Sequence, residues 1–251
     1  MTEMKLESKA ISILKDKIEL IPTAEGAIYL VGPIKLPVNL YGETVTFQWY
    51  CWLNCEEVAK DYEEVIAKLS DMNLAEMQQS SVLVYGDFAE EEDALIRMHS
   101  ICHTGDIFGS KRCDCGFQLK QSMQRIVEHG TGALFYLANH EGRGIGLFSK
   151  AMAYILQENG YDTVEANESL GFVDDSRDYT DAIQVLKALR TKPVTLMTNN
   201  PRKLAAMEQA GMQLSGRSAL WGDVSEFNEN YLKTKIVRSG HLGDEEICSN
   251  D

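Results

Sequence analysis

The sequence predicts an α/β protein in which a mixed β-sheet is flanked by helices. Two observations support this class. From residue 81 onward, short apolar runs of strand length alternate with segments in which apolar residues recur at helical spacing. Before residue 81, segments rich in β-branched and aromatic residues are separated by glycine and proline, as in short strands of a sheet or hairpin.

The composition indicates a folded protein with reduced cysteines. The chain has 251 residues, a hydrophobic fraction of 44% and a formal net charge of −14. So acidic a chain does not hold nucleic acid by broad phosphate neutralisation, and an anionic ligand must therefore meet a local basic pocket. The sequence contains neither a run of about 18 apolar residues nor the apolar core of a signal peptide. We expect a cytoplasmic protein with no nucleic-acid or membrane partner.

The first eighty residues are predicted to form strands and a helix, and they carry no chemical signature. Strands are expected at 27–31 and 44–52, where β-branched and aromatic residues concentrate. An amphipathic helix is expected within 55–79, where apolar residues recur among acids and lysines. Residues 1–80 are therefore interpreted as an N-terminal extension whose role the sequence leaves open.

The later elements follow the alternation of strand and helix. Strands are expected at 80–86, 94–99, 133–137 and 193–197. Helices are expected from 116 to 129, up to about 158, from about 179 to 190, and after Pro201. Residues 162–178 contain too many acids and too little periodicity for a simple element, and the last residues of the chain have the composition of a disordered acidic tail.

Three cysteines dominate the stretch RMHSICHTGDIFGSKRCDCGFQ at residues 97–118. Cys102, Cys113 and Cys115 fall within fourteen residues, and in a chain without an export signal this spacing favours a thiolate metal site over disulfides. Zinc suits thiolate sulfur, and three protein ligands leave a fourth position open, as in sites that perform chemistry. The alternative is three reduced core cysteines, which the polar surroundings make a poorer explanation.

A strand followed by the glycine-rich loop NHEGRGIG, residues 139–146, and then by a helix is a geometry that binds phosphate on backbone N–H groups. Within it, Glu141 and Arg143 could hold a base edge and a phosphate, respectively, although Arg143 could instead be a surface charge. The turn TNNPRK, residues 198–203, enters a helix with hydroxyl, amide and cationic groups. It is a second candidate anion site.

A third cluster of charges lies in residues 174–178. Asp175 is two residues from Arg177, so its carboxylate could orient the guanidinium or act as a general base beside it. The alternative is an N-cap with a solvated ion pair at the start of the next helix, which spacing alone favours.

Five motifs in this order resemble GTP cyclohydrolase II of riboflavin biosynthesis. They are residues 97–118, NHEGRGIG at 139–146, DTVEAN at 162–167, GFVDDSRDY at 171–179 and TNNPRK at 198–203. The resemblance covers roughly residues 81–216, with weaker similarity at 34–47 and in the later NENYLKTK and SGHL. Enzymes of that family open the imidazole ring of GTP and release C8 as formate together with pyrophosphate, which leaves 2,5-diamino-6-ribosylamino-4(3H)-pyrimidinone 5′-phosphate.

The resemblance implies a fold like that of GTP cyclohydrolase II and a role for each matched residue. The ligands of one zinc ion per subunit would be Cys102, Cys113 and Cys115. Tyr154 would take part in ring opening, and Arg177 with Asp175 would act at the α-phosphorus, where Arg177 is either a nucleophile or an electrostatic clamp. The nucleotide contacts would come from Arg97, His99, Gln118, Glu141, Gly142, Arg143, Thr163, Thr198 and Lys203. Magnesium would accompany the triphosphate, and the enzyme would be a homodimer.

The chain departs from the family pattern in ways that leave alternatives open. Ile101 stands where the family usually has glutamate, and one additional residue precedes Glu141. The alternatives are a cyclohydrolase that acts on another purine nucleotide or leaves a formamido product, and a zinc- and nucleotide-binding regulatory protein without turnover. The predicted organisation is an N-terminal extension at 1–80, a catalytic domain at 81–238 and an acidic, disordered tail at 239–251.

Overall fold

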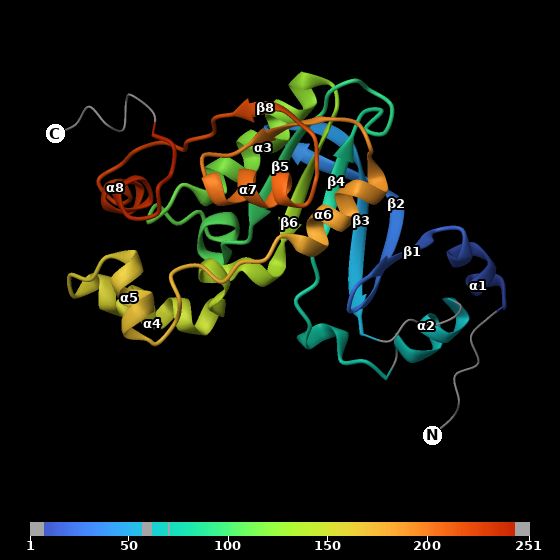
Figure 1. Cartoon of the computed structure of the whole chain (residues 1–251), viewed down its shortest axis with the longest axis horizontal. Coiled ribbons are helices and arrows are strands. Elements are labelled where there is room, and N and C mark those ends of the chain that lie inside the picture. The colour runs from blue at the N-terminus through green and yellow to red at the C-terminus, as the bar shows by residue number, and fades with distance from the viewer. Residues whose placement is uncertain (1–7, 57–61, 70, 244–251) are drawn as a thin grey trace.

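The computed structural model describes residues 8–56, 62–69 and 71–243. Within these ranges one eight-stranded mixed sheet is flanked by helices (Figure 1), which confirms the predicted α/β class. The strands are β1 (Ile18–Thr23), β2 (Gly26–Leu40), β3 (Glu43–Cys55), β4 (Ser81–Tyr85), β5 (Leu95–Ser100), β6 (Gly132–Leu137), β7 (Val194–Met197) and β8 (Leu214–Ser218). The α-helices are α1 (Ser8–Lys15), α2 (Tyr62–Leu69), α3 (Cys115–His129), α4 (Gly146–Glu158), α5 (Thr163–Ser169), α6 (Thr180–Leu189), α7 (Pro201–Gln209) and α8 (Glu229–Val237). None of the described helices is long and apolar enough to cross a membrane.

The sheet joins an antiparallel half to a parallel half. Its strand order is β1-β2-β3-β4-β6-β5-β7-β8; the pairs from β1 to β6 are antiparallel, and β6, β5, β7 and β8 run parallel. The β2–β3 hairpin turns at Tyr41 and Gly42, which both have positive φ, as a tight two-residue hairpin turn requires. Residues 18–55 thus extend the sheet that carries the rest of the chain, and the assignment of 1–80 to an N-terminal extension stays a prediction.

Alternate side chains of the central strands pack against helices on opposite faces of the sheet. Ile96 and Phe135 belong to the main core, which includes residues of α6 and α7. Leu95 and Leu134, one position earlier on each strand, pack instead with Ile126 of α3. This alternation is the two-residue period of a strand buried on both faces. In Figure 1, α6 and α7 accordingly lie in front of the sheet and α3 behind it.

The structure confirms the predicted strands and helices, and it adds five elements that the sequence did not predict: α1, β1, α5, β8 and α8. No element was expected within 162–178, yet α5 lies there. Asp162 accepts hydrogen bonds from the backbone N–H groups of Val164 and Glu165, and the Glu165 side chain accepts one from the N–H of Asp162. This capping box stabilises a helix too short to show an apolar period.

The predicted tail at 239–251 is described only as far as residue 243. In this part, the backbone N–H of Leu242 donates to the carbonyl oxygen of Asn199, so residues near 242 contact the body of the protein. Residues 244–251 lie outside the described ranges.

Three parallel strands end at the same edge of the sheet. β5, β6 and β7 end at Ser100, Leu137 and Met197, and β5 lies between the other two. The chain passes from β5 to β6 through α3 on one face, and it returns to β7 through α6 on the other face. Ligands of open α/β sheets bind at such a reversal, outside the carboxyl ends of the strands. The predicted site motifs all follow these strand ends or their helices.

Candidate active site

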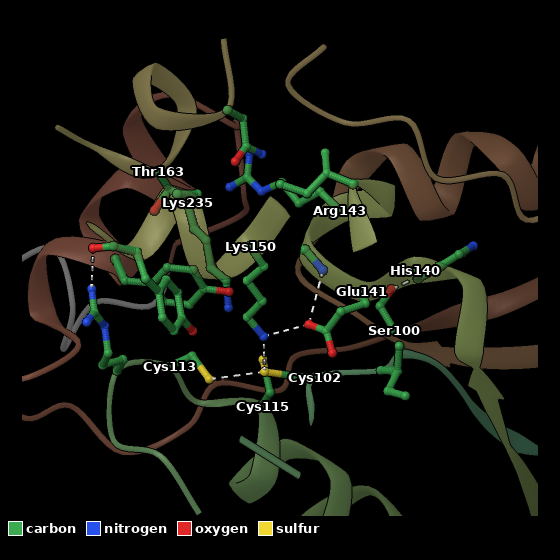
Figure 2. A pocket seen from close by; sticks show the side chains of 18 of the residues that line it. Ser100, Cys102, Cys113, Cys115, His140, Glu141, Arg143, Lys150, Thr163 and Lys235 are labelled. Atoms are coloured by element: carbon green, nitrogen blue, oxygen red, sulfur yellow. Dashed lines mark hydrogen bonds and ion pairs between the residues drawn. The ribbon is translucent and has the colours of Figure 1, made fainter. Parts of the chain in front are cut away.

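The three cysteines of the first motif converge beyond the end of β5 (Figure 2). Cys102 follows β5, whereas Cys113 and Cys115 lie at the start of α3. The Sγ atoms of Cys102 and Cys113 are 3.6 Å apart, and all three Sγ atoms lie within 4.8 Å of one another. A tetrahedral zinc ion with Zn–S bonds of about 2.3 Å spaces its sulfur ligands about 3.8 Å apart. The cluster therefore fits a zinc site with three protein ligands.

The loop between the cysteines is shaped to leave room for the sulfur atoms. A π-helical turn, His103–Ile107, follows Cys102, and the Gly105 N–H donates to the Cys102 Sγ at 3.4 Å. A β-carbon at Gly105 would lie 2.9 Å from the Cys113 Sγ and 3.1 Å from the Cys102 Sγ. Any larger residue would therefore displace the thiols.

Lys150 of α4 supplies a positive charge to the cluster. Its Nζ donates to the Cys102 Sγ at 3.2 Å and forms an ion pair with Glu141 at 2.6 Å, as Figure 2 shows. Hydrogen bonds from Cys113 and Cys115, and then the charge of Lys150, lower the pKa of the Cys102 thiol. The hydrogen bonds with Cys102 raise the pKa of Cys113 to about 11 and also raise that of Cys115. Because three thiolates repel one another, a divalent cation is needed to keep all three ionised.

The loop after β6 is held in an unusual backbone conformation. Gly142 and Arg143 have φ values of 61° and 66°, in the left-handed region. The Glu141 carboxylate accepts hydrogen bonds from the His103 backbone N–H at 2.6 Å and from Lys150. The Arg143 side chain is only 12% exposed and is paired with Asp174, so Arg143 is not a solvated surface charge.

Arg177 and Asp175 form a buried two-point ion pair. Nε and Nη2 of Arg177 donate to the two carboxylate oxygens of Asp175 at 2.7 and 2.6 Å, and the side chains are 13% and 8% exposed. Burial acts to raise the pKa of Asp175, but the hydrogen bonds and charge of Arg177 lower it to about 2. Since the pair is buried, it is not the solvated ion pair of the alternative interpretation.

Tyr154 of α4 lies on the same side as the cysteines. Its hydroxyl is 3.4 Å from the Thr104 hydroxyl, and the guanidinium of Arg112 lies 4.1 Å from the centre of its ring. Burial raises the pKa of Tyr154, so its hydroxyl stays protonated near neutral pH. Thr163 begins α5 beside it, and both line the cavity that contains the cysteines.

A second group of buried polar side chains lies beside the ends of β5 and β7. Arg97 donates to the Gln118 side chain at 2.5 Å, and Lys203 donates to the carbonyl oxygen of Met98 at 2.7 Å. Burial, and then the nearby charges of Arg97 and Arg177, hold the pKa of Lys203 well below its usual range. A lysine so placed gains stability from an anionic ligand.

The site residues line two adjoining cavities. The cysteine cavity has a volume of about 800 Å³, part of it open to solvent, and contains the three cysteines, Glu141, Gly142, Arg143, Tyr154 and Thr163. The cation cavity, of about 530 Å³, contains Arg97, His99, Gln118, Thr198 and Lys203. The residues that line both cavities are Ser100, Cys115, Arg177, Tyr231, Lys235 and His241. Asp175 lines neither cavity but is paired with Arg177, so the structure brings all the predicted site residues together.

Several side chains of the site were not identified from the sequence. Lys150 precedes Tyr154 by four residues on α4, and this helical spacing is the signal that could have placed both on one face. Tyr231, Lys235 and His241 belong to the motifs NENYLKTK and SGHL, whose similarity to the family carried no assigned role.

His140, also not predicted, connects to Arg177 through a hydroxyl group. The His140 Nε2 donates to the carbonyl oxygen of Asp178 at 2.7 Å, which leaves Nδ1 as an acceptor for the Ser100 hydroxyl at 3.2 Å. The Ser100 Oγ in turn accepts from Nη1 of Arg177 at 3.3 Å. Burial, together with the charges of Arg177 and Lys203, lowers the pKa of His140 to about 4. His140 is therefore neutral near pH 7.

We expect the low pKa of His140 to make the protein lose stability in mild acid. Between pH 6.5 and 4, His140 is protonated in the unfolded protein but neutral in the folded protein. Protonation therefore favours the unfolded state, and the free energy of unfolding falls as the pH falls. For this residue alone the loss from pH 7 to pH 5 is about 2 kcal/mol. Urea unfolding at both pH values should therefore show a smaller loss for His140→Gln. The control, Gln124→Ala on the exposed side of α3, removes no titrating group and should leave the loss unchanged; equal losses for all three proteins would contradict the expectation.

Residues 63–219 match the family described as GTP cyclohydrolase II. The riboflavin biosynthesis protein RibBA of Bacillus velezensis is 48% identical over 171 residues, which cover 68% of this chain and 43% of the relative. RibBA of Bacillus subtilis is 52% identical over 152 residues, or 61% of this chain and 38% of the relative. The bifunctional riboflavin biosynthesis protein RIBA 1, chloroplastic, of Arabidopsis thaliana is 49% identical over 160 residues, or 64% of this chain and 30% of the relative. The chain thus spans less than half the length of these relatives.

Proposed function

Because the chain belongs to the GTP cyclohydrolase II family of hydrolases, we propose that it opens the imidazole ring of GTP, with release of C8 as formate and of pyrophosphate. The product is 2,5-diamino-6-ribosylamino-4(3H)-pyrimidinone 5′-phosphate, and the names of the relatives support a place in riboflavin biosynthesis. One observation carries the proposal: the thiol cluster and the Arg177–Asp175 pair face adjoining cavities that share lining residues. A single nucleotide can therefore present its purine to one centre and its phosphates to the other.

The cation cavity is suited to the triphosphate. It gathers Arg97, Arg177, Lys203 and Lys235 in a chain whose net charge is −14, which meets the requirement for a local basic pocket. Guanidinium and ammonium groups donate charge-assisted hydrogen bonds to phosphate oxygens. Magnesium would neutralise the remaining phosphate charge.

The cysteine cavity is suited to the purine. Zinc bound by Cys102, Cys113 and Cys115 would supply Lewis-acid chemistry for the hydrolysis at C8. Tyr154, protonated at neutral pH, is available to donate a proton to the ring nitrogen released on opening. Glu141 is held in one orientation by Lys150 and a backbone N–H, so its remaining lone pairs can accept hydrogen bonds from the base edge.

Arg177 acts as an electrostatic clamp on the α-phosphate and the departing pyrophosphate. Asp175, with a pKa of about 2, is a weak base, and it already accepts two hydrogen bonds from the guanidinium. Burial acts to lower the pKa of Arg177, but Tyr179 and the pairing with Asp175 raise it above its usual range, so loss of its proton is unfavourable. A charged guanidinium has no lone pair for attack on phosphorus, whereas it stabilises developing phosphate charge well.

Several finer features complete the proposal. The active form is a homodimer in the cytoplasm with one zinc ion per subunit, and the catalytic domain spans residues 81–238. Ile101 lines the cysteine cavity with an apolar side chain. Since the family usually has glutamate there, this position favours one alternative, a purine nucleotide other than GTP.

The proposal is tested by incubating the zinc-loaded protein with magnesium and either GTP or ATP, and by measuring formate and pyrophosphate separately. We expect equal amounts of both from GTP and neither from ATP. Turnover of ATP alone would overturn the proposal that guanine is the preferred base, and it would identify Ile101 as a residue that determines base specificity. Pyrophosphate without formate would overturn ring opening, and no release from either nucleotide would overturn the hydrolytic function.

A further inference from the structure

The C-terminal segment, residues 220–242, lies beyond the region that matches the family, yet both of its ends are bonded to Asn199 of the TNNPRK motif. The Asn199 side chain donates to the carbonyl oxygen of Leu220 at 2.7 Å and accepts from the Leu220 N–H at 3.1 Å. The Asn199 carbonyl oxygen accepts from the N–H of Leu242 at 2.9 Å. The segment, which includes α8, is therefore fixed against the site at its start and at its end.

The middle of the segment is bonded to the metal-binding loop. Lys235 of α8 forms an ion pair with Asp114 at 2.6 Å, and the Gly222 N–H donates to the same carboxylate at 3.4 Å. Asp114 is 1% exposed and lies between Cys113 and Cys115. A β-carbon at Gly222 would lie 2.4 Å from the β-carbon of Asp114, so the backbone approaches as closely as glycine allows. These contacts place α8 against the loop that carries two of the cysteines.

This attachment brings three side chains of the segment to the junction of the two cavities. Tyr231, Lys235 and His241 are half of the six residues that line both the cysteine cavity and the cation cavity. Figure 2 shows Lys235 among the side chains around the cysteine cavity. A nucleotide with its purine in one cavity and its outer phosphates in the other would have its ribose and α-phosphate at this junction, where Arg177 also lies.

The ammonium group of Lys235 has hydrogen-bonding capacity left for such a ligand. Of its three N–H donors, one is directed to Asp114, and the Nζ lies 4.4 Å from the centre of the Tyr231 ring. Within the described ranges, Asp114 is the one acceptor bonded to this Nζ. The side chain is 12% exposed, so a ligand contact there is shielded from water.

We propose that Lys235 is a substrate-binding residue that donates to the nucleotide near its α-phosphate, beside Arg177, and that the C-terminal segment forms a wall of the nucleotide site. This inference rests on the proposed function. The ion pair with Asp114 fixes the position of the Lys235 ammonium group, and its remaining N–H donors contact the phosphate.

The test measures binding of a GTP analogue with a non-hydrolysable α,β-bridge, and of guanosine, to the zinc-loaded protein by calorimetry. Lys235→Met should weaken analogue binding about tenfold to hundredfold, as expected for a lost hydrogen bond to a charged group, and should leave guanosine binding unchanged. The matched control is Lys233→Met: Lys233 is on the same helix but is paired with exposed Glu229, and this change should alter neither affinity.

Two further variants separate direct binding from support of the loop. Asp114→Asn keeps the ammonium and should retain analogue affinity to within about threefold. The double variant Asp114→Asn, Lys235→Met leaves no unpaired buried carboxylate, so it should fold, keep its zinc and show the same weak binding as Lys235→Met.

Either of two results would overturn the role of Lys235. Unchanged analogue binding by the double variant would exclude the contact, and equal losses in Asp114→Asn and Lys235→Met would show that Lys235 acts only through Asp114. If the unmodified protein binds the analogue no more tightly than guanosine, the proposed function fails, and the inference fails with it. If the unmodified protein binds the analogue more tightly than guanosine but the Lys235 variants bind it equally well, the inference fails while the proposed function stands.

Discussion

Replacing Cys113 with serine is expected to abolish the proposed zinc binding and to lower formate release from GTP by more than about a hundredfold, while the protein stays folded. Loss of a residue that only supports a metal ligand costs about 10- to 100-fold in affinity or activity, and loss of a ligand itself should cost more. The fold should persist because the core lies between the sheet and its helices, away from the cysteine loop. Metal analysis, circular dichroism and the formate assay measure the three parts of this expectation.

The matched control is Cys51→Ser. Cys51 is a half-buried free cysteine of β3 whose thiol donates to the carbonyl oxygen of Ser80, remote from Cys102, Cys113 and Cys115, so this change should leave zinc binding and activity intact. Nucleotide binding by Cys113→Ser should also survive, because the cation cavity keeps its charges. An unfolded Cys113→Ser protein would instead show that zinc has a structural role.

Replacing Arg177 with alanine is expected to lower pyrophosphate release by about a thousandfold or more, the size of effect seen when an arginine that stabilises a phosphoryl-transfer transition state is lost. The change also leaves Asp175 as a buried carboxylate without its two-point partner. Arg177→Lys should recover part of the activity, since it keeps the charge but not the paired geometry. The control is Arg125→Gln: Arg125 is bonded to the carbonyl oxygen of Ala219 on the outer side of α3, and this change should have little effect.

The two possible roles of Arg177, electrostatic clamp and nucleophile, predict different masses for the protein during turnover. A clamp forms no covalent bond, so protein quenched at neutral pH in mid-reaction should have an unchanged mass. A mass increase by one nucleotidyl group (a nucleoside monophosphate less one water), mapped to the peptide that contains Arg177, would contradict the clamp and establish the nucleophile.

The sequence was sufficient to predict β5, β6 and β7 of the parallel half of the sheet, though not β8, and the motifs that follow these strands. The apolar run at 133–137 is a strand buried on both faces, and each motif that follows such a strand reaches the same edge. Strand ends and loop glycines are local properties that one sequence displays. What it does not display is which strand neighbours which, and thus that Arg97 would lie beside Lys203, over a hundred residues later.

The elements and contacts that the sequence did not predict leave no periodic pattern of apolar residues. α5 is specified by a capping box rather than by an apolar face, and α8 buries a single residue, Leu232. The buried charge pairs were invisible for the same reason: the partner of Asp114 is Lys235, 121 residues away. The Arg177–Asp175 pair was visible as a spacing, but only burial distinguishes it from a solvated pair.

Both ends of the C-terminal segment are bonded to one residue, Asn199. A chain terminus held at one point frays residue by residue, because each lost contact leaves the others intact. Here a local opening at Asn199 would release Leu220 and Leu242 together, while Gly222 and Lys235 would still bond the middle of the segment to Asp114. In the proposed nucleotide site, a change at Asn199 would therefore loosen both ends of the wall at once.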